Sequence, residues 1–424
     1  MDNDCSSNKK APGCSRKEAD AAPRACGPLA GLSDHFADML GNCLTYAEDA
    51  KKAGRPVVGI LCEFTPRELI LAAGGVPVCL CGGSLEMIAP AEEILPANLC
   101  PLIKSTFGYH LTRSNPFLEM ADLLVAETTC DGKKKMYELM AESRTMHVLE
   151  LPQKSDDPDA LAHWRAELAK LRDVLANRYS VRIDDGRLRQ AIRTTNRYRA
   201  LRRRLADLMA ADSPPLTGRQ LLDFKSNIWC MESDMAAYEN ALAKMEESAA
   251  SCGGASAIPG RRARNACSKK VRVLLTGVPV LHGAQKVVDI IESSGGLVVC
   301  MENCTGLKPL LQDVDETLAD PLDALAEKYF SLPCSVMTPN DRRLESLRRL
   351  ARQYRPDCVI DLAWQGCLTY DVESARVKSL ADRELNLPFL RISTDYSPND
   401  AARIALRVEA LFETARARQG DACP

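Results

Sequence analysis

Short apolar runs alternate with segments of helical periodicity in two parts of the chain. In the first part, the runs lie at residues 57–62, 76–80, 123–126 and 146–151. In the second part, they lie at residues 271–276, 297–301, 359–362 and 389–393. Apolar runs of this length predict buried strands, and strands that alternate with helices favour a doubly wound parallel sheet. The pattern therefore predicts an α/β protein with two doubly wound parallel-sheet domains.

The stretch between these two parts has a different pattern. Residues 156–248 contain leucines at helical spacing and no strand signal, which predicts a helical segment that joins the two domains. An arginine cluster in this stretch has two interpretations, nucleotide phosphate binding or a solvated helix face, and the second is favoured: Arg197, Arg199, Arg202, Arg203 and Arg204. The expected organisation is a disordered tail (1–28), a first α/β domain (29–155), the helical segment (156–248), a flexible connector (249–270) and a second α/β domain (271–424).

The second α/β part repeats the first. Residues 74–79 (GGVPVC) are similar to residues 295–300 (GGLVVC), and each of these runs is followed by a cysteine in the next loop. A second cysteine follows beside a proline in each part, and a third follows a strand that begins near an aspartate. The repeat therefore yields two sets of three cysteines, Cys81, Cys100 and Cys130 in the first part and Cys304, Cys334 and Cys367 in the second.

Cys130 is the clearest member of this group. It follows the apolar run 123–126 and directly precedes a helical pattern, for which Asp131 is the expected N-cap. A helix N-terminus stabilises negative charge and so favours a thiolate. A lone cysteine at such a place is more often a small core residue, but the repeat places all six at the carboxyl edge of a parallel sheet, where such sheets bind ligands.

Three thiolates on separate loops suit a 4Fe–4S cluster with one iron left open. Zinc is the alternative, although structural zinc sites normally contain close C-x-x-C pairs, and the nearest approach here is Cys79-x-Cys81. The sequence contains no GxxxxGK[ST] loop, no GxGxxG after the first strand and no HExxH motif. We therefore expect no ATP hydrolysis by a P-loop of this chain.

Composition narrows the class of protein. The 424 residues include 55 basic and 57 acidic side chains, a balance that gives no reason to expect nucleic-acid or membrane binding. Eighteen cysteines in so long a chain, with neither a signal-peptide pattern nor a 20-residue apolar run, indicate a cytoplasmic protein whose cysteines act as ligands rather than disulfides.

Five segments then point to one family: residues 62–68 (CEFTPRE), 95–105 (LPANLCPLIKS), 127–135 (ETTCDGKKK), 302–306 (ENCTG) and 394–397 (TDYS). Together they resemble the 2-hydroxyacyl-CoA dehydratase and benzoyl-CoA reductase family (D-component), from about residue 32 to the last helix. Within this family, the set of six cysteines most resembles that of the double-cubane cluster proteins. That resemblance implies two 4Fe–4S units in one chain, joined by a bridging sulfide as 8Fe–9S, in a chain that pairs with itself.

The resemblance also implies a function. An ATP-dependent activator protein with its own 4Fe–4S cluster would deliver low-potential electrons, and the chain would reduce a small-molecule substrate. The first alternative is a subunit of a (R)-2-hydroxyacyl-CoA dehydratase, which uses a single 4Fe–4S cluster and a ketyl radical on an acyl-CoA substrate. The second alternative is a non-enzymatic iron–sulfur scaffold or sensor.

Two departures from the family pattern affect the site. The family's segment Gln-Ala-Cys-His-Thr-Tyr reads QGCLTY at residues 365–370, so Leu368 stands in place of histidine. Some relatives have cysteine at the positions of Val278 and Val336. Cys62 is a seventh candidate, which we expect to lie beside the cluster as a near neighbour; the alternative is that it replaces Cys81 as a ligand. It has no counterpart in the second part, where Val278 stands at that position.

Three glutamates lie near the proposed ligands, and each follows a predicted strand: Glu63, Glu127 and Glu302. Each is a candidate proton donor for catalysis. The alternative is that each caps a helix or pairs with Lys104 or Lys133.

Overall fold

The computed structural model describes residues 27–251 and 270–420. The tail expected over 1–28 and the connector expected over 249–270 therefore lie almost wholly outside the described residues. The strands are β1 (Val57–Ile60), β2 (Val76–Cys79), β3 (Leu123–Glu127), β4 (Met146–Leu149), β5 (Val271–Gly277), β6 (Gly296–Glu302), β7 (Cys358–Trp364) and β8 (Phe389–Thr394). Each lies at a predicted apolar run.

The helices fall into three groups along the chain. The first group is α1 (Ala30–Phe36), α2 (Met39–Lys52), α3 (Arg67–Ala72), α4 (Ile88–Glu92), α5 (Pro101–Thr112), α6 (Pro116–Met120) and α7 (Asp131–Ala141). The second is α8 (Ala160–Arg178), α9 (Asp185–Asp207), α10 (Gly218–Asp223) and α11 (Glu232–Ser251). The third is α12 (Lys286–Ser293), α13 (Pro321–Phe330), α14 (Asp341–Tyr354), α15 (Leu368–Leu380) and α16 (Ala401–Gly420). No helix among the described residues is long and apolar enough to cross a membrane.

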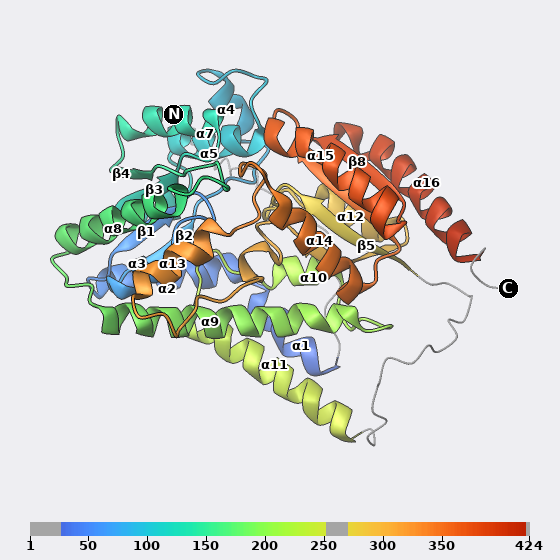
Figure 1. The fold of residues 1–424 in the computed structure, drawn as a ribbon, viewed down its shortest axis with the longest axis horizontal. Coiled ribbons are helices and arrows are strands. Elements are labelled where there is room, and N and C mark those ends of the chain that lie inside the picture. Colours follow the sequence, from blue (N-terminus) through green and yellow to red (C-terminus); the bar gives the residue numbers. More distant parts are fainter. Residues whose placement is uncertain (1–26, 252–269, 421–424) are drawn as a thin grey trace, which may run out of the picture.

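The strands form two separate four-stranded sheets, both wholly parallel (Figure 1). The orders are β2-β1-β3-β4 and β6-β5-β7-β8, which are the same order when β5 is matched to β1. We call each sheet and its intervening helices a half. Every residue of the central strands β1, β3, β5 and β7 is buried, as expected where helices cover both faces. The predicted α/β fold class, with two doubly wound parallel sheets, is confirmed.

A hydrogen bond that recurs in both halves shows how closely the repeat is kept. Asp122, just before β3, accepts a hydrogen bond from the backbone N–H of Val57 at 2.9 Å. Asp357, just before β7, accepts one from the N–H of Arg272 at 2.9 Å. Each aspartate therefore aligns the starts of two neighbouring central strands in the same way.

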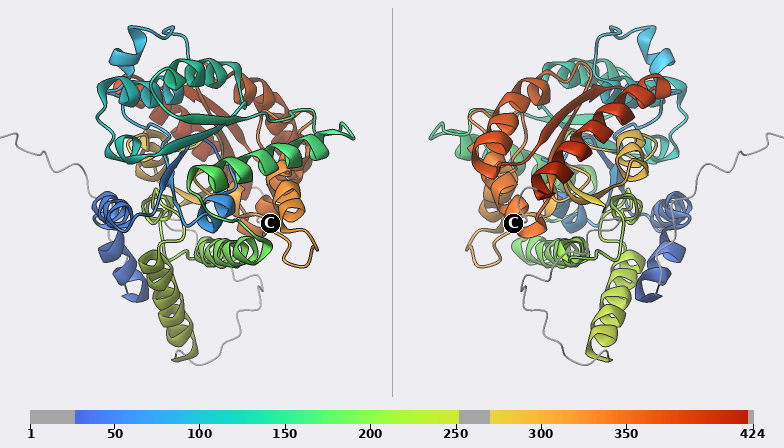
Figure 2. Two further views of the ribbon diagram at one scale, coloured as in Figure 1. Left: turned by 90° about the vertical axis from the view of Figure 1, so that its left-hand side faces the viewer. Right: turned by 90° about the vertical axis from the view of Figure 1, so that its right-hand side faces the viewer.

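The helices of residues 160–251 pack on both halves. Helix α9 contacts α3 of the first half and α13 of the second, and α8 contacts α13. The two views of Figure 2 show α11 beside α1, on one side of the sheets. This stretch is helical as predicted, whereas the exact domain boundaries stay a prediction.

A buried polar network joins α3, α9 and α13. The guanidinium of Arg199 lies 2.5 Å from the carboxylate of Glu68, and both side chains are fully buried. The hydroxyls of Thr195 and Tyr329 each donate to the same carboxylate at 2.7 Å. Burial alone would raise the pKa of Glu68, but Arg199 and the two hydroxyls lower it to about 2.

This network corrects two sequence-based predictions. Residues 65–68 (TPRE) have the sequence pattern of a capping box between Thr65 and Glu68, with Pro66 at the first helical position. Instead Pro66 occupies the N-cap of α3, Thr65 donates its hydroxyl to Glu127, and Glu68 turns to Arg199. The prediction that the arginine cluster forms a solvated helix face is also only partly right, because Arg199 and Arg202 are buried. The other three members form ion pairs, with Glu239, Asp313 and Glu246.

We expect Glu68→Gln to lower the free energy of unfolding by about 3–5 kcal/mol, because Arg199 would remain buried without its counter-charge. Urea unfolding at pH 7 measures this, with Tyr329→Phe as a control that removes one hydrogen bond and costs about 1 kcal/mol. Since the folded pKa of Glu68 lies below the ordinary 4.5, its contribution is present above pH 4.5 and is lost as the pH falls toward 2. A wild-type urea midpoint in Glu68→Gln would contradict the assigned role of the pair.

Candidate metal centre

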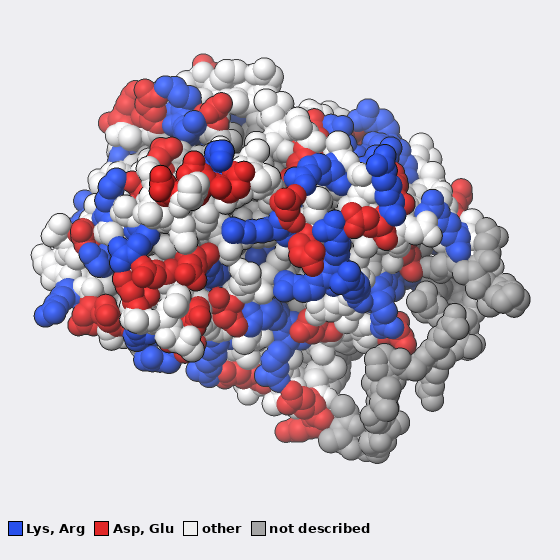
Figure 3. Space-filling view, viewed as in Figure 1, with Lys and Arg blue, Asp and Glu red and all other residues white. Residues whose placement is uncertain are grey.

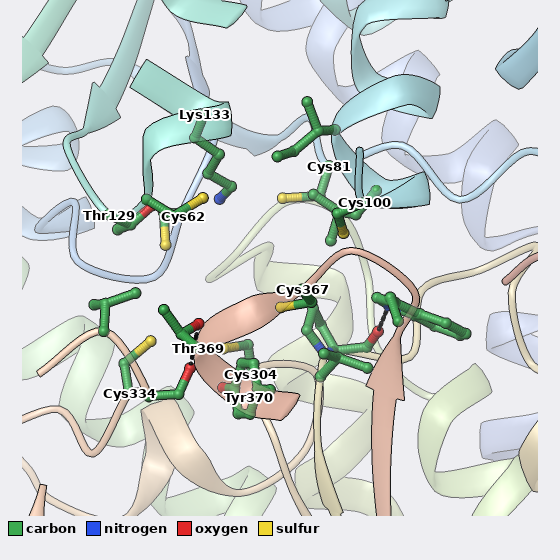
Figure 4. A pocket seen from close by; sticks show the side chains of 18 of the residues that line it. Cys62, Cys81, Cys100, Thr129, Lys133, Cys304, Cys334, Cys367, Thr369 and Tyr370 are labelled. Carbon is green, nitrogen blue, oxygen red and sulfur yellow. Dashed lines mark hydrogen bonds between the residues drawn. The ribbon is translucent and has the colours of Figure 1, made fainter. Parts of the chain in front are cut away.

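A cavity of about 440 Å³ lies between the carboxyl ends of the two sheets. It is lined by loops that follow β1, β2 and β3 in the first half and β5, β6 and β7 in the second. This is the edge at which parallel α/β sheets bind ligands. Figure 4 shows the labelled sulfurs of the two halves facing the same space.

All six cysteines of the repeat line this cavity: Cys81, Cys100, Cys130, Cys304, Cys334 and Cys367. Their local positions also follow the repeat. Cys81 and Cys304 each lie two residues after the end of a strand, β2 and β6 respectively, and Cys130 and Cys367 each occupy the N-cap of a helix. The remaining two differ, because Cys100 is the N-cap of α5 whereas Cys334 lies in the loop after α13. Cys62 and Cys79 also line the cavity.

Cys130 rather than Asp131 is the N-cap of α7, which corrects the sequence-based prediction. Asp131 is the first helical residue, and its carboxylate pairs with Lys134 at 2.8 Å. The thiol group therefore lies closer to the free amides of the helix than expected. This position favours a negatively charged sulfur more strongly than the predicted one.

The loops of the two halves touch backbone to backbone near Cys100 and Cys367. Gly366 adopts φ +78°, and a Cβ at this position would lie 2.5 Å from the carbonyl oxygen of Asn98. Only glycine allows both the conformation and the approach. A hydrogen bond between the side chains of Cys100 and Cys367 lowers the pKa of Cys100 and raises that of Cys367. The two sets of cysteines thus meet at this contact.

Burial raises the pKa of several of these thiols. It raises the pKa of Cys304 to about 12, and it raises that of Cys130 and Cys62 above the ordinary value. A group of buried thiolates therefore needs nearby positive charge, from a metal or from cationic side chains.

Two half-buried lysines supply part of that charge. Lys133 lines the cavity, and its ammonium donates to the carbonyl of Leu61 at 2.9 Å; the thiol of Cys81 donates to the same oxygen at 3.4 Å. Burial would lower the pKa of Lys133, but Cys62, Tyr137 and Cys81 raise it well above its ordinary value. Lys225, from the loop after α10, also lines the cavity and lies 3.4 Å from the carbonyl of Cys304.

The three candidate glutamates occupy different positions. Glu63 lines the cavity and is held by Arg67 at 2.8 Å. Glu127 is fully buried behind the lining; burial raises its pKa to about 7, and its Oε2 has no hydrogen-bond partner among the described residues. Glu302 also lies behind the lining, 2.5 Å from the Thr276 hydroxyl. Their catalytic roles stay predictions.

Sequence reasoning missed a relay that links Glu302 to the cavity. The ammonium of Lys308 lies 3.4 Å from Glu302 and donates to the hydroxyl of Tyr370 at 2.7 Å, and Tyr370 lines the cavity. Lys225 was missed as well, because it lies in the helical segment, far in sequence from every cysteine motif. The only available signal was Tyr370, which stands three residues after Cys367 within the family segment.

The residues around the cavity fit an iron–sulfur cofactor. Thiolates are the soft ligands that iron–sulfur clusters prefer, and Lys133 and Lys225 offset their charge. Apolar side chains such as Leu99, Ile103 and Trp364 form much of the remaining wall. Among the described residues, no three His, Cys, Asp or Glu side chains are grouped closely enough to hold a single metal ion.

Comparisons with known proteins agree with the motifs. The sequence profile of the 2-hydroxyglutaryl-CoA dehydratase D-component matches residues 62–415. YjiM of Escherichia coli (strain K12), provisionally named a dehydratase subunit, is 39% identical over 91% of this chain and 98% of its own length. The (R)-phenyllactyl-CoA dehydratase beta subunit of Clostridium sporogenes is 21% identical over 89% and 97%. One subunit of the benzoyl-CoA reductase of Thauera aromatica is 28% identical over 39% and 46%.

We expect Lys133→Met to weaken retention of iron by roughly tenfold, a typical cost of losing a residue that supports metal ligands from behind. The reason is that Cys62 and Cys130 would lose the positive charge that opposes the effect of burial on the pKa of their thiols. Iron analysis of anaerobically purified protein under increasing chelator measures this. Lys134→Met is the matched control, since Lys134 pairs with the exposed Asp131 and should retain wild-type iron. Equal iron retention in the two variants would show that Lys133 does not support the thiolates.

Proposed function

Because this chain belongs to the 2-hydroxyglutaryl-CoA dehydratase D-component family, whose relatives here are dehydratase and reductase subunits, we propose that it is an iron–sulfur reductase of the double-cubane type. It accepts low-potential electrons from an ATP-dependent activator and reduces a small substrate in the cavity. The observation that carries the proposal is the convergence of six cysteines, three from each half, on one cavity.

The two halves supply matched ligand sets. In the proposal, Cys81, Cys100 and Cys130 hold one 4Fe–4S unit, and Cys304, Cys334 and Cys367 hold the other. Such a cofactor supplies stored electrons at low potential and an iron open to substrate. The contact between Cys100 and Cys367 supports the adjacency of the two sets. A sulfide bridge between the two units, as in an 8Fe–9S form, is what the resemblance to double-cubane proteins implies.

Polar side chains around the cavity hold and donate protons in this proposal. Tyr370 accepts a hydrogen bond from Lys308, so its own hydroxyl proton is free to be donated toward the cavity. Glu302 holds Lys308 in place and therefore acts as a positioning residue for Tyr370. Glu63 is the one candidate glutamate that reaches the cavity itself. Leu368, which replaces the histidine of the family segment, has no ionisable group, so the proton path does not use that position.

Electron delivery requires partners. Family membership supports an activator protein that carries its own 4Fe–4S cluster and hydrolyses ATP. We further propose that the chain forms a homodimer, as the resemblance to double-cubane proteins implies. The apolar wall of the cavity suits a small substrate of low polarity.

One of the comparisons favours a second candidate function, that of a dehydratase subunit. The (R)-phenyllactyl-CoA dehydratase beta subunit matches almost the whole chain, whereas less than half of the chain matches the benzoyl-CoA reductase relative. In this alternative the chain is a dehydratase subunit with a single 4Fe–4S cluster and an acyl-CoA substrate. The cysteines of the second half would then have no ligand role.

Iron content separates the two functions. We expect about eight irons per chain in anaerobically purified protein, since two four-iron units are proposed. Cys334→Ala should remove one unit and leave about four, because the three first-half ligands remain. Iron and acid-labile sulfide analysis measures both values. About four irons in the wild type, unchanged in Cys334→Ala, would establish the single-cluster alternative.

Activity assays on the same variant form a second test. We expect Cys334→Ala to abolish ATP- and activator-dependent reduction of small substrates, because one four-iron unit stores too little charge for multi-electron reduction. Each reaction is measured with wild type and variant side by side, together with iron content. Retention of 2-hydroxyacyl-CoA dehydration at half the iron content would refute the reductase.

A further inference from the structure

A second cavity, of about 290 Å³, opens on the other side of the loop that carries Cys334. Its lining comes from α13, α14 and the chain before and after α13, and it shares no residue with the cysteine cavity. Leu332 and Pro333 face this groove, and the next residues, Cys334 and Ser335, face the cysteine cavity. The same loop therefore forms a wall of both.

The groove is lined by positive charge. Lys328 lies on its floor with only 6% of its surface exposed, and Arg342 and Arg349 lie at its rim, two turns apart on α14. The hydroxyls of Ser331 and Ser346 lie between them. The single carboxylate of the lining, Glu345, pairs with Arg348, which lies outside it. Figure 3 shows Lys and Arg side chains gathered over α14 on this face.

A fourth cation of the lining, Lys308, pairs with Glu302. Among the described residues, Lys328, Arg342 and Arg349 have no carboxylate partner. Arg342 donates to the carbonyl of Phe330 at 3.1 Å, and Lys328 to that of Pro309 at 3.3 Å. Arg349 makes no hydrogen bond or ion pair within the described part of the chain. Its neighbour Arg348, in contrast, binds both oxygens of Glu384 at 2.7 and 2.8 Å.

A buried lysine without a counter-charge is costly. Burial, together with Arg199 behind it, lowers the pKa of Lys328 to about 7. An anion in the groove would offset the charge of Lys328 and of both arginines at once. Two guanidinium groups beside a buried ammonium form the arrangement that binds phosphate by charge-assisted hydrogen bonds.

The groove continues into a second lobe of about 360 Å³. Four residues line both lobes: Gln312, Lys328, Ser331 and Arg342. The second lobe also contains the apolar side chains of Leu161 and Phe330 and three carboxylates, those of Asp313, Asp315 and Glu327. Asp313 is paired with Arg203. This shape provides room for an organic body attached to the anion.

From these observations we propose that the groove between α13 and α14 binds a phosphate-bearing small molecule. Lys328, Arg342 and Arg349 contact the phosphate, and the second lobe holds the group attached to it. The site is separate from the cysteine cavity, so it stands whether the chain proves to be a reductase or a dehydratase. Its ligand contacts the outer face of the loop that presents Cys334.

Calorimetric titration of the full chain, purified anaerobically with its cofactor, tests the site. The probes are pyrophosphate for a free anion, ADP for a nucleotide and coenzyme A for a thioester carrier. We expect one site per chain, and binding weakened by about tenfold in Arg342→Gln and again in Arg349→Gln, since each removes a charge-assisted hydrogen bond. The probe that binds most tightly identifies the source of the phosphate.

Arg352→Gln is the matched control. It removes the same charge from the same helix, but from a residue that does not line the groove, and the affinity of this variant should stay within about twofold of wild type, a difference below one ordinary hydrogen bond. Equal weakening of binding in Arg352→Gln and Arg349→Gln would show that only the overall positive charge of α14 matters, and it would overturn the site. So would a wild-type chain that binds none of the three probes. Both outcomes are independent of iron content and of turnover.

Discussion

The buried pair of Glu68 and Arg199 is the constraint on which the arrangement of the halves depends. Glu68 comes from the helix after the first strand, Arg199 from the long helix between the halves, and Tyr329 hydrogen-bonds the same carboxylate from the second half. A buried charge is tolerated only when its partners are all in place. The network therefore favours one relative position of three helices, and that position brings the two sheet edges to one cavity.

The chemistry of the cavity follows from a balance between burial and charge. Burial opposes ionisation of the thiols, as the raised pKa of Cys304 indicates, while Lys133 and helix N-termini favour it. Soft ligands in such a place suit a cofactor that brings its own positive charge. The relay from Glu302 through Lys308 to Tyr370 connects a buried carboxylate to the cavity while the carboxylate itself stays buried.

Local patterns predicted most of the fold, and long-range contacts explain the rest. The strands and the repeat could be predicted because apolar runs and the GGVPVC and GGLVVC segments are local signals. The direction of Glu68 could not, since a capping box looks the same in sequence whether or not a buried arginine competes for the carboxylate. Lys225 and the α13–α14 groove were also invisible, because their residues meet only once the chain has folded.

The backbone contact at Gly366 has a consequence for how proteins of this design diversify. The main chain of one half rests directly on that of the other beside Cys100 and Cys367, with no side chain between them. The main chain therefore sets the spacing of these sulfurs, and substitutions of the surrounding side chains leave that spacing unchanged. Positions such as Leu368, Val278 and Val336 line the same space but take no part in that contact. A lineage can then vary these walls, and with them its range of substrates, while the sulfur frame stays fixed.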